Sequence, residues 1–167
     1  MASRVAAVSS QVRFILHGQG PLREAMEARI GKRRLRNLVV MAGVTDDPFN
    51  AMSLMDVLLL TSRGEGLPNV VMEAQSVGTA VVCTNAGGAA EAVNPGKSGW
   101  IVDSDDAASL ANAVVNLILN PKTLQTALEE GPAFVRCKFG IERMIAETVD
   151  AYRLEPAKIS DRRLVSN

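Results

Sequence analysis

The chain has 167 residues; 47% of them are hydrophobic and 22% are charged, and 18 basic side chains balance 18 acidic ones. This length fits one domain with a real hydrophobic core, and the absence of net charge argues against nucleic acid as the main partner. The uncharged apolar runs are about as long as a strand, far below the roughly 20 residues that a membrane-spanning helix needs, and the amino terminus lacks the layout of a secretory signal.

Along the whole chain, short apolar runs alternate with segments of helical periodicity. This alternation is typical of an α/β fold in which helices cover both faces of a parallel sheet. We therefore predict a doubly wound, Rossmann-like parallel sheet of about five strands. The predicted strands are Val12–His17, Leu38–Ala42, Val57–Leu60, Ala80–Thr84 and Gly99–Val102. The predicted helices are Pro21–Arg34, Pro48–Met55, Pro68–Val77, Gly88–Val93, Ala107–Asn120, part of Lys122–Lys138, and Gly140–Leu154.

Proline and glycine mark the ends and breaks of several predicted helices. Pro21, Pro48 and Pro68 each stand at a first helical position, where the missing N–H would have no partner anyway. The pair Gly131-Pro132 is expected to break or kink the helical segment around it. We assign residues 1–154 to one domain and residues 155–167 to a polar tail that frays.

The two cysteines, Cys83 and Cys137, are too few and too far apart in sequence for a disulfide framework or a metal site. Cys83 falls in a predicted strand, where it serves as a small hydrophobic residue, and we expect a reducing, cytoplasmic compartment. The lone histidine, His17, stands at the carboxyl end of a predicted strand, where α/β folds bind ligands. A single histidine at that place more often caps the end of the strand and has no part in ligand binding.

Two glutamates eight residues apart, Glu65 and Glu73, stand on either side of a helix start at Pro68. The N–H groups of Asn69 and Val70 are free at that start, where the helix dipole favours an anion. Glu73 would lie roughly 7.5 Å along the axis from Pro68, within reach of a ribose diol beside a bound diphosphate. Glu65 would accept hydrogen bonds from a second sugar. The pattern suits a ligand of the form sugar–diphosphate–sugar, although it also fits a solvated glutamate in an ordinary strand–turn–helix unit.

Three glycine-containing turns follow predicted strands. Gly18 and Gly20 follow the first strand, Thr45 stands in the turn after the second, and Gly87 and Gly88 follow the fourth. Because parallel strands end at one edge of their sheet, we expect these turns to converge on the loop with the two glutamates. Each turn alone is also explained as a tight turn. The last one would expose its amides to the distal phosphate or sugar of the ligand.

Three segments, taken together, form a pattern that is specific for one protein family. They are Glu65-Gly-Leu-Pro-Asn-Val-Val-Met-Glu73-Ala, Gly78-Thr-Ala-Val-Val and Gly87-Gly88-Ala-Ala-Glu91. In this order and at this spacing they resemble the donor-binding, C-terminal domain of the family-four glycosyltransferases. Members of that family are retaining, metal-independent enzymes of the GT-B fold, and this pair of glutamates is their characteristic sequence motif. The resemblance covers roughly Val12 to Tyr152.

The resemblance implies transfer of a hexosyl group from a nucleoside diphosphate sugar to an acceptor, with retention, in polysaccharide or glycolipid biosynthesis. It implies that Glu65 is the catalytic residue, which orders the donor sugar and steadies its oxocarbenium-like charge, and that residues 1–154 bind the nucleotide sugar. It implies neither a cofactor nor a metal. The donor-binding residues that it carries over are Gly18, Gly20, Thr45, Gly66, Leu67, Pro68, Asn69, Val70, Glu73, Gly87 and Gly88.

The resemblance also points to segments that this sequence lacks. In the family the domain begins with a strand, a glycine-rich turn with an arginine, and a lysine soon after; both cations neutralise the leaving diphosphate. Here Arg4–Ser10 corresponds to the end of the first helix, so we expect this strand, the two cations and the N-terminal acceptor domain to be missing. The strand would occupy the middle of the sheet, and its loss would open two strand edges. We therefore expect a gapped sheet or a homodimer, and no activity of the chain alone.

Two interpretations of other classes stay open. One is a nucleotide-binding module without catalysis, and the other is half of a sugar-nucleotide epimerase with GT-B architecture, which a single histidine disfavours. The basic cluster Lys32-Arg33-Arg34 with Arg36 stands at a predicted helix end, where cations complement the dipole. It is interpreted as a solvated face, with contact to a membrane surface as the weaker alternative.

Overall fold

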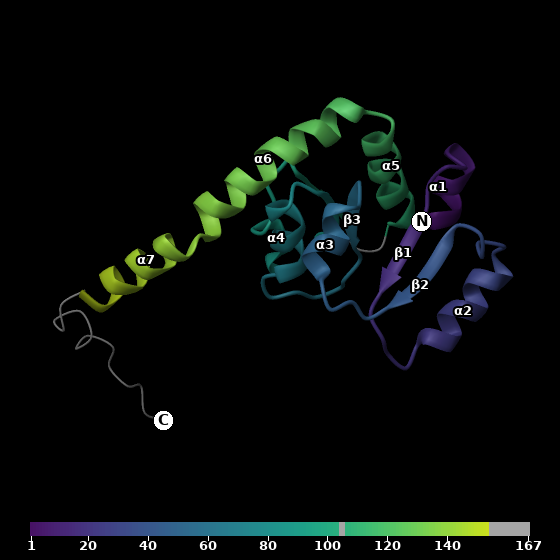
Figure 1. The fold of residues 1–167 in the computed structure, drawn as a ribbon, viewed down its shortest axis with the longest axis horizontal. Coiled ribbons are helices and arrows are strands. Elements are labelled where there is room, and N and C mark those ends of the chain that lie inside the picture. Colours follow the sequence, from purple (N-terminus) through teal and green to yellow (C-terminus); the bar gives the residue numbers. More distant parts are fainter. Residues whose placement is uncertain (104–105, 154–167) are drawn as a thin grey trace, which may run out of the picture.

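The computed structural model describes residues 1–103 and 106–153, and strands and helices alternate in it as predicted (Figure 1). The strands are β1 (Phe14–His17), β2 (Val39–Gly43), β3 (Val57–Leu60), β4 (Ala80–Thr84) and β5 (Gly99–Val102). The helices are α1 (Ala2–Val8), α2 (Arg23–Lys32), α3 (Pro48–Ser53), α4 (Asn69–Ser76), the 3₁₀ helix η1 (Gly87–Ala90), α5 (Ala107–Ile118), α6 (Pro121–Phe139) and α7 (Ile141–Arg153). The predicted end of the last helix, Leu154, and the predicted tail lie outside the described residues.

The strands form two separate parallel sheets. β1 pairs with β2, with Phe14 opposite Val39, and β3, β4 and β5 pair in that order, with Val57 opposite Ala80. The five predicted parallel strands are confirmed, and so is the predicted gap, which divides them into two sheets. Strands pair only when they lie about 4.8 Å apart, and no segment within residues 1–103 and 106–153 bridges β1 and β3.

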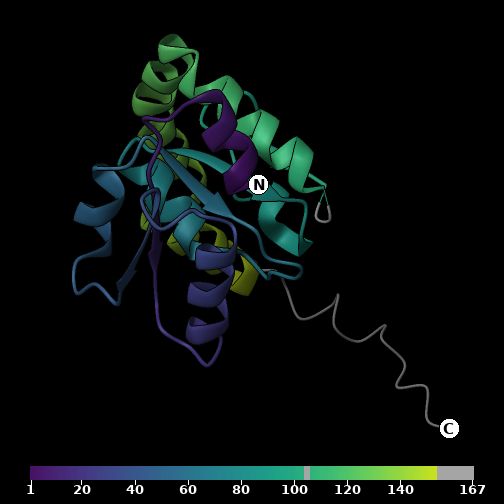
Figure 2. The same cartoon turned by 90° about the vertical axis from the view of Figure 1, so that its right-hand side faces the viewer.

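Helices cover both faces of the three-stranded sheet, and its central strand β4 runs through the middle of the core. On one face Val82 packs with Val5 of α1 and Leu110 of α5, and on the other face Val81 packs with Val71 of α4. Figure 2 shows α1 lying beside α5, which it contacts. All five residues of β4 are buried because strands border both of its edges and helices border both of its faces.

The apolar strand β3, predicted to be buried, is only half-buried along its whole length. One of its edges pairs with β4, but the other borders a cavity of about 1230 Å³ that separates the two sheets. On the far side of this cavity, Ile15 of β1 is 50% exposed. The composition of β3 fits a central strand, and the gap between the sheets lowers its burial.

The long helix α6 runs for 19 residues and continues through Gly131-Pro132, so the helix is not broken there. A proline removes one intrahelical hydrogen bond, but the packing of α6 along α4 and α5 keeps the helix in place. Gly131 permits this packing, since a Cβ atom there would lie 2.7 Å from the carbonyl oxygen of Gln75.

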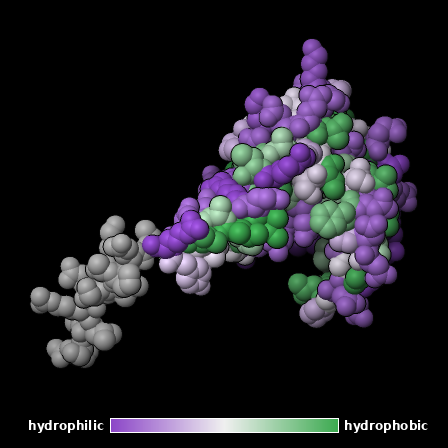
Figure 3. Space-filling view, turned by 60° about the vertical axis from the view of Figure 1, so that its left-hand side comes forward, coloured by the Kyte–Doolittle hydropathy of each residue, from purple (hydrophilic) through white to green (hydrophobic). Residues whose placement is uncertain are grey.

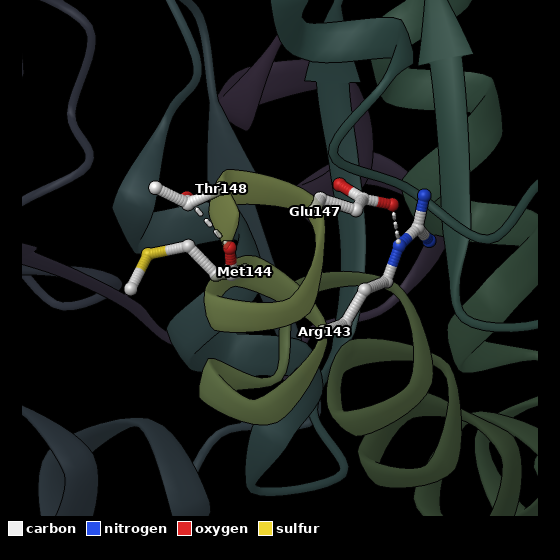
Figure 4. Close-up of polar contacts among 4 residues, drawn as sticks. All are labelled: Arg143, Met144, Glu147 and Thr148. Carbon is white, nitrogen blue, oxygen red and sulfur yellow. Dashed lines mark hydrogen bonds and ion pairs between the residues drawn. The ribbon is translucent and has the colours of Figure 1, made fainter. Parts of the chain in front are cut away.

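The last helix, α7, extends away from the sheets at the end of α6 (Figure 1). None of its residues is buried, and Ile141, Met144 and Ile145 are each more than half exposed. The space-filling view shows hydrophobic surface on this arm (Figure 3). Its polar side carries an ion pair of 2.6 Å between Arg143 Nε and Glu147 Oε1 (Figure 4). No helix among the described residues is both long and apolar enough to cross a membrane.

Candidate functional site

The loop between β3 and α4 carries Glu65, and the end of β4 and the turn after it hold this loop from one side. Thr84 Oγ1 donates a hydrogen bond to the carbonyl oxygen of Ser62, and the N–H of Gly88 donates to the carbonyl oxygen of Glu65 at 3.3 Å. Glu65 is half-buried, whereas Leu67 is exposed. The backbone of the loop is therefore attached to the three-stranded sheet at two points.

Glycine is required in the turn that holds this loop. A Cβ atom on Gly87 would collide with the carbonyl oxygen of Glu65, and one on Gly88 would collide with that of Gly66. Gly87 also has a φ of 54°, in the left-handed region that favours glycine. The turn leads into η1, a single 3₁₀ turn where Gly88–Val93 was predicted to form a helix. Because the N–H of Gly88 is already donated to Glu65, this residue shapes the loop rather than offering its amide to a ligand.

Helix α4 begins at the end of the same loop. Pro68 is its N-cap, with φ −73° and ψ 105°, so the helix starts at Asn69, one residue later than predicted. The N–H groups of the first helical residues, here Asn69 and Val70, have no partner within the helix. Glu73 lies one turn further along and is half-buried. The free N–H groups and the carboxylate of Glu73 thus belong to one helix.

A buried glutamine that the sequence patterns do not single out, Gln75, connects α4 to the segment after η1. Its Nε2 donates to the carbonyl oxygens of Val71 (3.1 Å) and Ala92 (2.6 Å), and its Oε1 accepts from Asn94 N–H (3.1 Å) and Ser98 Oγ (2.8 Å). Both N–H groups and both lone pairs of the amide side chain are thereby used. A polar residue on the otherwise apolar buried face of α4 is the pattern that would have identified it.

The loops after β1 and β2 are connected to each other. The N–H of Gly18 donates to the carbonyl oxygen of Gly43 at 2.7 Å, and both glycines have positive φ. Thr45 Oγ1 accepts a hydrogen bond of 3.2 Å from the N–H of Asp47, the N-cap of α3. Gly20 is exposed, with open space around it. Gly18 and Thr45 therefore lie together at the carboxyl edge of the two-stranded sheet.

The cavity between the sheets links the two groups of candidate residues. It is lined by His17 and Thr45 from the first sheet and by Val70 from the first turn of α4. Glu65 and Glu73 are not among its lining residues. The predicted place of His17 at the end of β1 is confirmed, and its side chain is exposed. The structure thus places one group of candidates around Glu65 and another along the lining of this cavity.

Both cysteines are free, and only Cys83 lies in the core. Burial raises the pKa of the Cys83 thiol to about 11, so that the thiol stays protonated at neutral pH. The predicted role of Cys83 as a small hydrophobic residue is confirmed.

Residues 1–120 match the model of a protein family described as glycosyl transferases group 1. Over 161 residues the chain is 32% identical to the Vi polysaccharide biosynthesis protein VipC/TviE of Salmonella typhi. This alignment covers 93% of this chain and 27% of that protein.

Solved structures share the fold. HepE of Anabaena in complex with UDP superposes with a TM-score of 0.80 at 27% identity, over 89% of this chain and 43% of HepE; its complex with UDP-glucose gives a TM-score of 0.78. The C-terminal domain of the glycosyl transferase group 1 family protein LpcC of Francisella tularensis gives a TM-score of 0.70 at 20% identity, over 83% of this chain and 77% of that domain. These similarities confirm the Rossmann-like fold, and the chain spans less than half the length of VipC/TviE and HepE.

Proposed function

The chain belongs to the family of group 1 glycosyl transferases, and from this premise we propose that it is the donor-binding part of an enzyme that transfers a hexosyl group, with retention, from a nucleoside diphosphate sugar to an acceptor. The complexes of HepE with UDP and with UDP-glucose support a nucleotide sugar as the ligand of this chain as well. The relationship to a polysaccharide biosynthesis protein supports a role in polysaccharide or glycolipid synthesis.

The observation that carries this proposal is the backbone contact between Gly88 and Glu65 beside the start of α4. It holds the loop with Glu65 next to a helix start whose N–H groups, those of Asn69 and Val70, are available to an anion. A diphosphate at this helix start is favoured by the dipole. The carboxylates of Glu65 and Glu73 would repel it at close range and therefore suit the two sugars on either side.

Each part of the ligand has a proposed partner. Glu65 orders the hydroxyl groups of the donor sugar and stabilises the positive charge that develops as the glycosidic bond breaks. Glu73 accepts hydrogen bonds from the ribose diol, and the backbone amide of Gly87 adds to the phosphate site. The connected turns of Gly18 and Thr45 contact the nucleobase. Gly20, Gly66, Leu67 and Pro68 complete the backbone wall of the site.

We propose further that transfer needs neither a metal ion nor a cofactor, because the N–H groups and the dipole at the helix start balance part of the charge of the diphosphate. A separate N-terminal domain of a longer polypeptide would hold the acceptor. The large share of VipC/TviE and HepE that this chain does not span supports such a domain. The reaction would take place in the cytoplasm.

A second candidate function is nucleotide binding without catalysis. The observation that favours it is again that the chain covers only 27% of VipC/TviE and 43% of HepE. A domain of this kind can bind a nucleotide without catalysing sugar transfer, because the transfer also depends on a second domain. Family membership favours both of these candidates over the epimerase alternative.

Calorimetric titration with UDP, GDP and ADP, followed by the corresponding nucleotide sugars, tests the proposal. We expect one nucleoside diphosphate to bind and its sugar derivative to displace it. If no nucleotide or nucleotide sugar binds, the donor-binding role is wrong. If nucleotides bind but the longer polypeptide with its N-terminal domain transfers no sugar, the non-catalytic alternative is correct.

A further inference from the structure

A short backbone segment after β4 connects the loop of Glu65 to helix α4. This η1 segment, residues 87–92, contains η1 and the turn that follows it. Near its beginning, the N–H of Gly88 donates to the carbonyl oxygen of Glu65 at 3.3 Å. At its end, Nε2 of Gln75 in α4 donates to the carbonyl oxygen of Ala92 at 2.6 Å. The η1 segment therefore lies between the loop that carries Glu65 and the helix that carries Glu73.

The η1 segment is held together by turns along its length. The N–H groups of Ala89, Glu91 and Ala92 each donate to a carbonyl oxygen three residues earlier, at 3.0–3.1 Å. Ala89 and Ala92 are also completely buried. Because buried segments are closely packed and transmit displacements, we expect a movement of Ala92 to move Gly88 as well.

Apolar side chains pack between the η1 segment and α4, and one polar side chain lies among them. Val71 and Ala74 of α4 share a buried cluster with Ala89 and Ala92. Apolar contacts are non-directional, so they hold two elements together without fixing their register. The completely buried amide of Gln75, by contrast, makes four hydrogen bonds in defined directions. Gln75 therefore fixes how α4 is placed against the η1 segment.

The amide of Gln75 holds the chain on both sides of the buried residue Val93. Its Nε2 bonds the carbonyl oxygen of Ala92 before this residue, and its Oε1 accepts from the N–H of Asn94 after it, at 3.1 Å. The same Oε1 accepts from Ser98 Oγ at 2.8 Å. With bonds on both sides of Val93, the end of the η1 segment can neither slide along α4 nor rotate against it.

The placement of the η1 segment bears on the geometry of the donor site, an inference that rests on the proposed function. In that function Glu65 contacts the donor sugar, whereas the start of α4 and Glu73 contact the nucleotide. A binding site keeps its geometry only when the hydrogen bonds around it hold its residues in place. The distance between the sugar contact and the nucleotide contacts then depends on the link from α4 through the η1 segment to Glu65.

We propose that Gln75 is a positioning residue of the donor site. Through the η1 segment it places the loop of Glu65 relative to α4, and it thereby determines the affinity of the site for the sugar part of a nucleoside diphosphate sugar. Gln75 itself touches no part of the ligand in this proposal.

A comparison of two ligands separates positioning from a purely structural role. Loss of stability lowers the fraction of folded protein, and this weakens the binding of every ligand by the same factor. A displaced loop of Glu65 instead weakens the binding of a nucleotide sugar more than that of the bare nucleotide. The informative quantity is therefore the ratio of the two dissociation constants, called here the sugar ratio.

The first test is Gln75→Met, which keeps an unbranched side chain in the core and removes all four hydrogen bonds. The sugar ratio is measured by calorimetry with UDP, GDP and ADP and with the glucose derivative of each. Hydrogen exchange of the ligand-free chain compares the N–H of Gly88 with that of Val82, which lies in the central strand and reports global unfolding. Gln125→Met, at an exposed position of α6, is the matched control.

We expect Gln75→Met to change the sugar ratio at least roughly tenfold, which is less than the effect of misplacing a reacting group by about 1 Å. The N–H of Gly88 should exchange at least about tenfold faster relative to Val82. The Gln125→Met control should show neither change.

The second test is Gln75→Glu, whose effect should depend on pH. A protonated carboxyl group at this place can still donate to Ala92, whereas a carboxylate would face the carbonyl oxygens of Val71 and Ala92 without a proton. Burial raises the pKa of such a carboxyl group, so the network is present below this pKa and is lost as the pH rises through it. The sugar ratio should thus be close to that of wild type at about pH 5 and approach that of Gln75→Met toward about pH 8.

Other titrating groups are removed by comparing the variant with wild type at each pH, because both proteins contain them. On the elements packed around Gln75 they are Glu73 of α4, Glu91 and Lys97 of the chain after β4, and the charged residues of α6.

The proposal is overturned if Gln75→Met weakens both ligands by the same factor, or if the exchange of Gly88 relative to Val82 stays as in wild type. If Gln75→Met does not fold, Gln75→Glu decides, and a sugar ratio that stays constant from about pH 5 until the variant unfolds overturns the proposal. If wild type binds no nucleotide and no nucleotide sugar, the proposed function is wrong. The exchange of Gly88 in the ligand-free chain then still shows whether Gln75 positions the loop.

Discussion

The backbone N–H of Gly88 lies 3.3 Å from the carbonyl oxygen of Glu65 and donates a hydrogen bond to it. This bond connects the turn after β4 to the loop after β3, at the point where the proposed catalytic carboxylate leaves the backbone. No Cβ atom fits at either glycine of the turn, because the loop backbone lies directly against it. The position of Glu65 therefore depends on residues that are far from it in the sequence.

Replacement of Gly88 by alanine should displace the loop of Glu65, because the added methyl group meets the carbonyl oxygen of Gly66. We expect a loss of roughly 1–3 kcal/mol in stability, as for other overpacked sites, and weaker binding of the nucleotide sugar. Thermal unfolding and calorimetry measure both quantities. Gly64→Ala in the same loop is the control, since open space surrounds Gly64. Equal effects of the two substitutions would show that the contact is unimportant.

Gln75→Leu should destabilise the chain, because it leaves the buried partners Ser98 Oγ and the N–H of Asn94 without an acceptor. Each unsatisfied buried group costs about 1–3 kcal/mol, and a chain of this size loses roughly 2–4 °C in melting temperature per kcal/mol. Gln125→Leu on the exposed side of α6 is the matched control and should stay within about 0.5 kcal/mol. A melting temperature that is the same for both variants would contradict the role of this network.

Glu73→Gln should weaken binding of the nucleoside diphosphate by roughly 1–3 kcal/mol, the usual effect of losing a charged acceptor. Glu142→Gln, on the exposed first turn of α7, controls for the change in net charge. Titration with the bare nucleotide measures the effect. Unchanged affinity both for Glu73→Gln and for a variant of the Pro68 loop would remove this assignment of the site.

Glu65→Ala should behave differently in a longer polypeptide that includes the acceptor domain. If Glu65 acts on the donor sugar and its developing charge, turnover should fall roughly 10²-fold or more, while the affinity for the bare nucleotide stays nearly constant. Steady-state kinetics and titration of the same protein separate the two effects. Equal losses in both would mean that Glu65 supports the loop and takes no part in the reaction.

The chain alone should transfer no sugar, because catalysis requires donor and acceptor to be held together, and positioning contributes roughly 7–11 kcal/mol. Within residues 1–103 and 106–153, β1 and β3 each pair along one edge only, so we also expect a low melting temperature or self-association. Transfer assays and light scattering after size exclusion check these expectations. A monodisperse monomer that turns over a nucleotide sugar would refute this prediction.

Much of the local structure of the chain was predictable from short sequence patterns. The bounds of β3, β4 and β5 were predicted to the residue, because each is a short apolar run between turn residues whose preferences are local. The motif from Glu65 to Glu73 indicated the family. The resemblance to this family, whose domain begins with a further strand, also predicted that the sheet would be gapped. The start of α4 was predicted within one residue, because proline is common at the start of a helix and Pro68 therefore marks where α4 begins.

The way in which these elements pack against one another was not predictable from such patterns. The half-burial of β3 follows from the cavity beside it, and the continuity of α6 through Pro132 follows from its packing on α4 and α5. The network of Gln75 and the bond from Gly88 to Glu65 each connect residues that are about twenty positions apart. Local preferences carry no information about such partners, because these contacts form only when separate elements pack together.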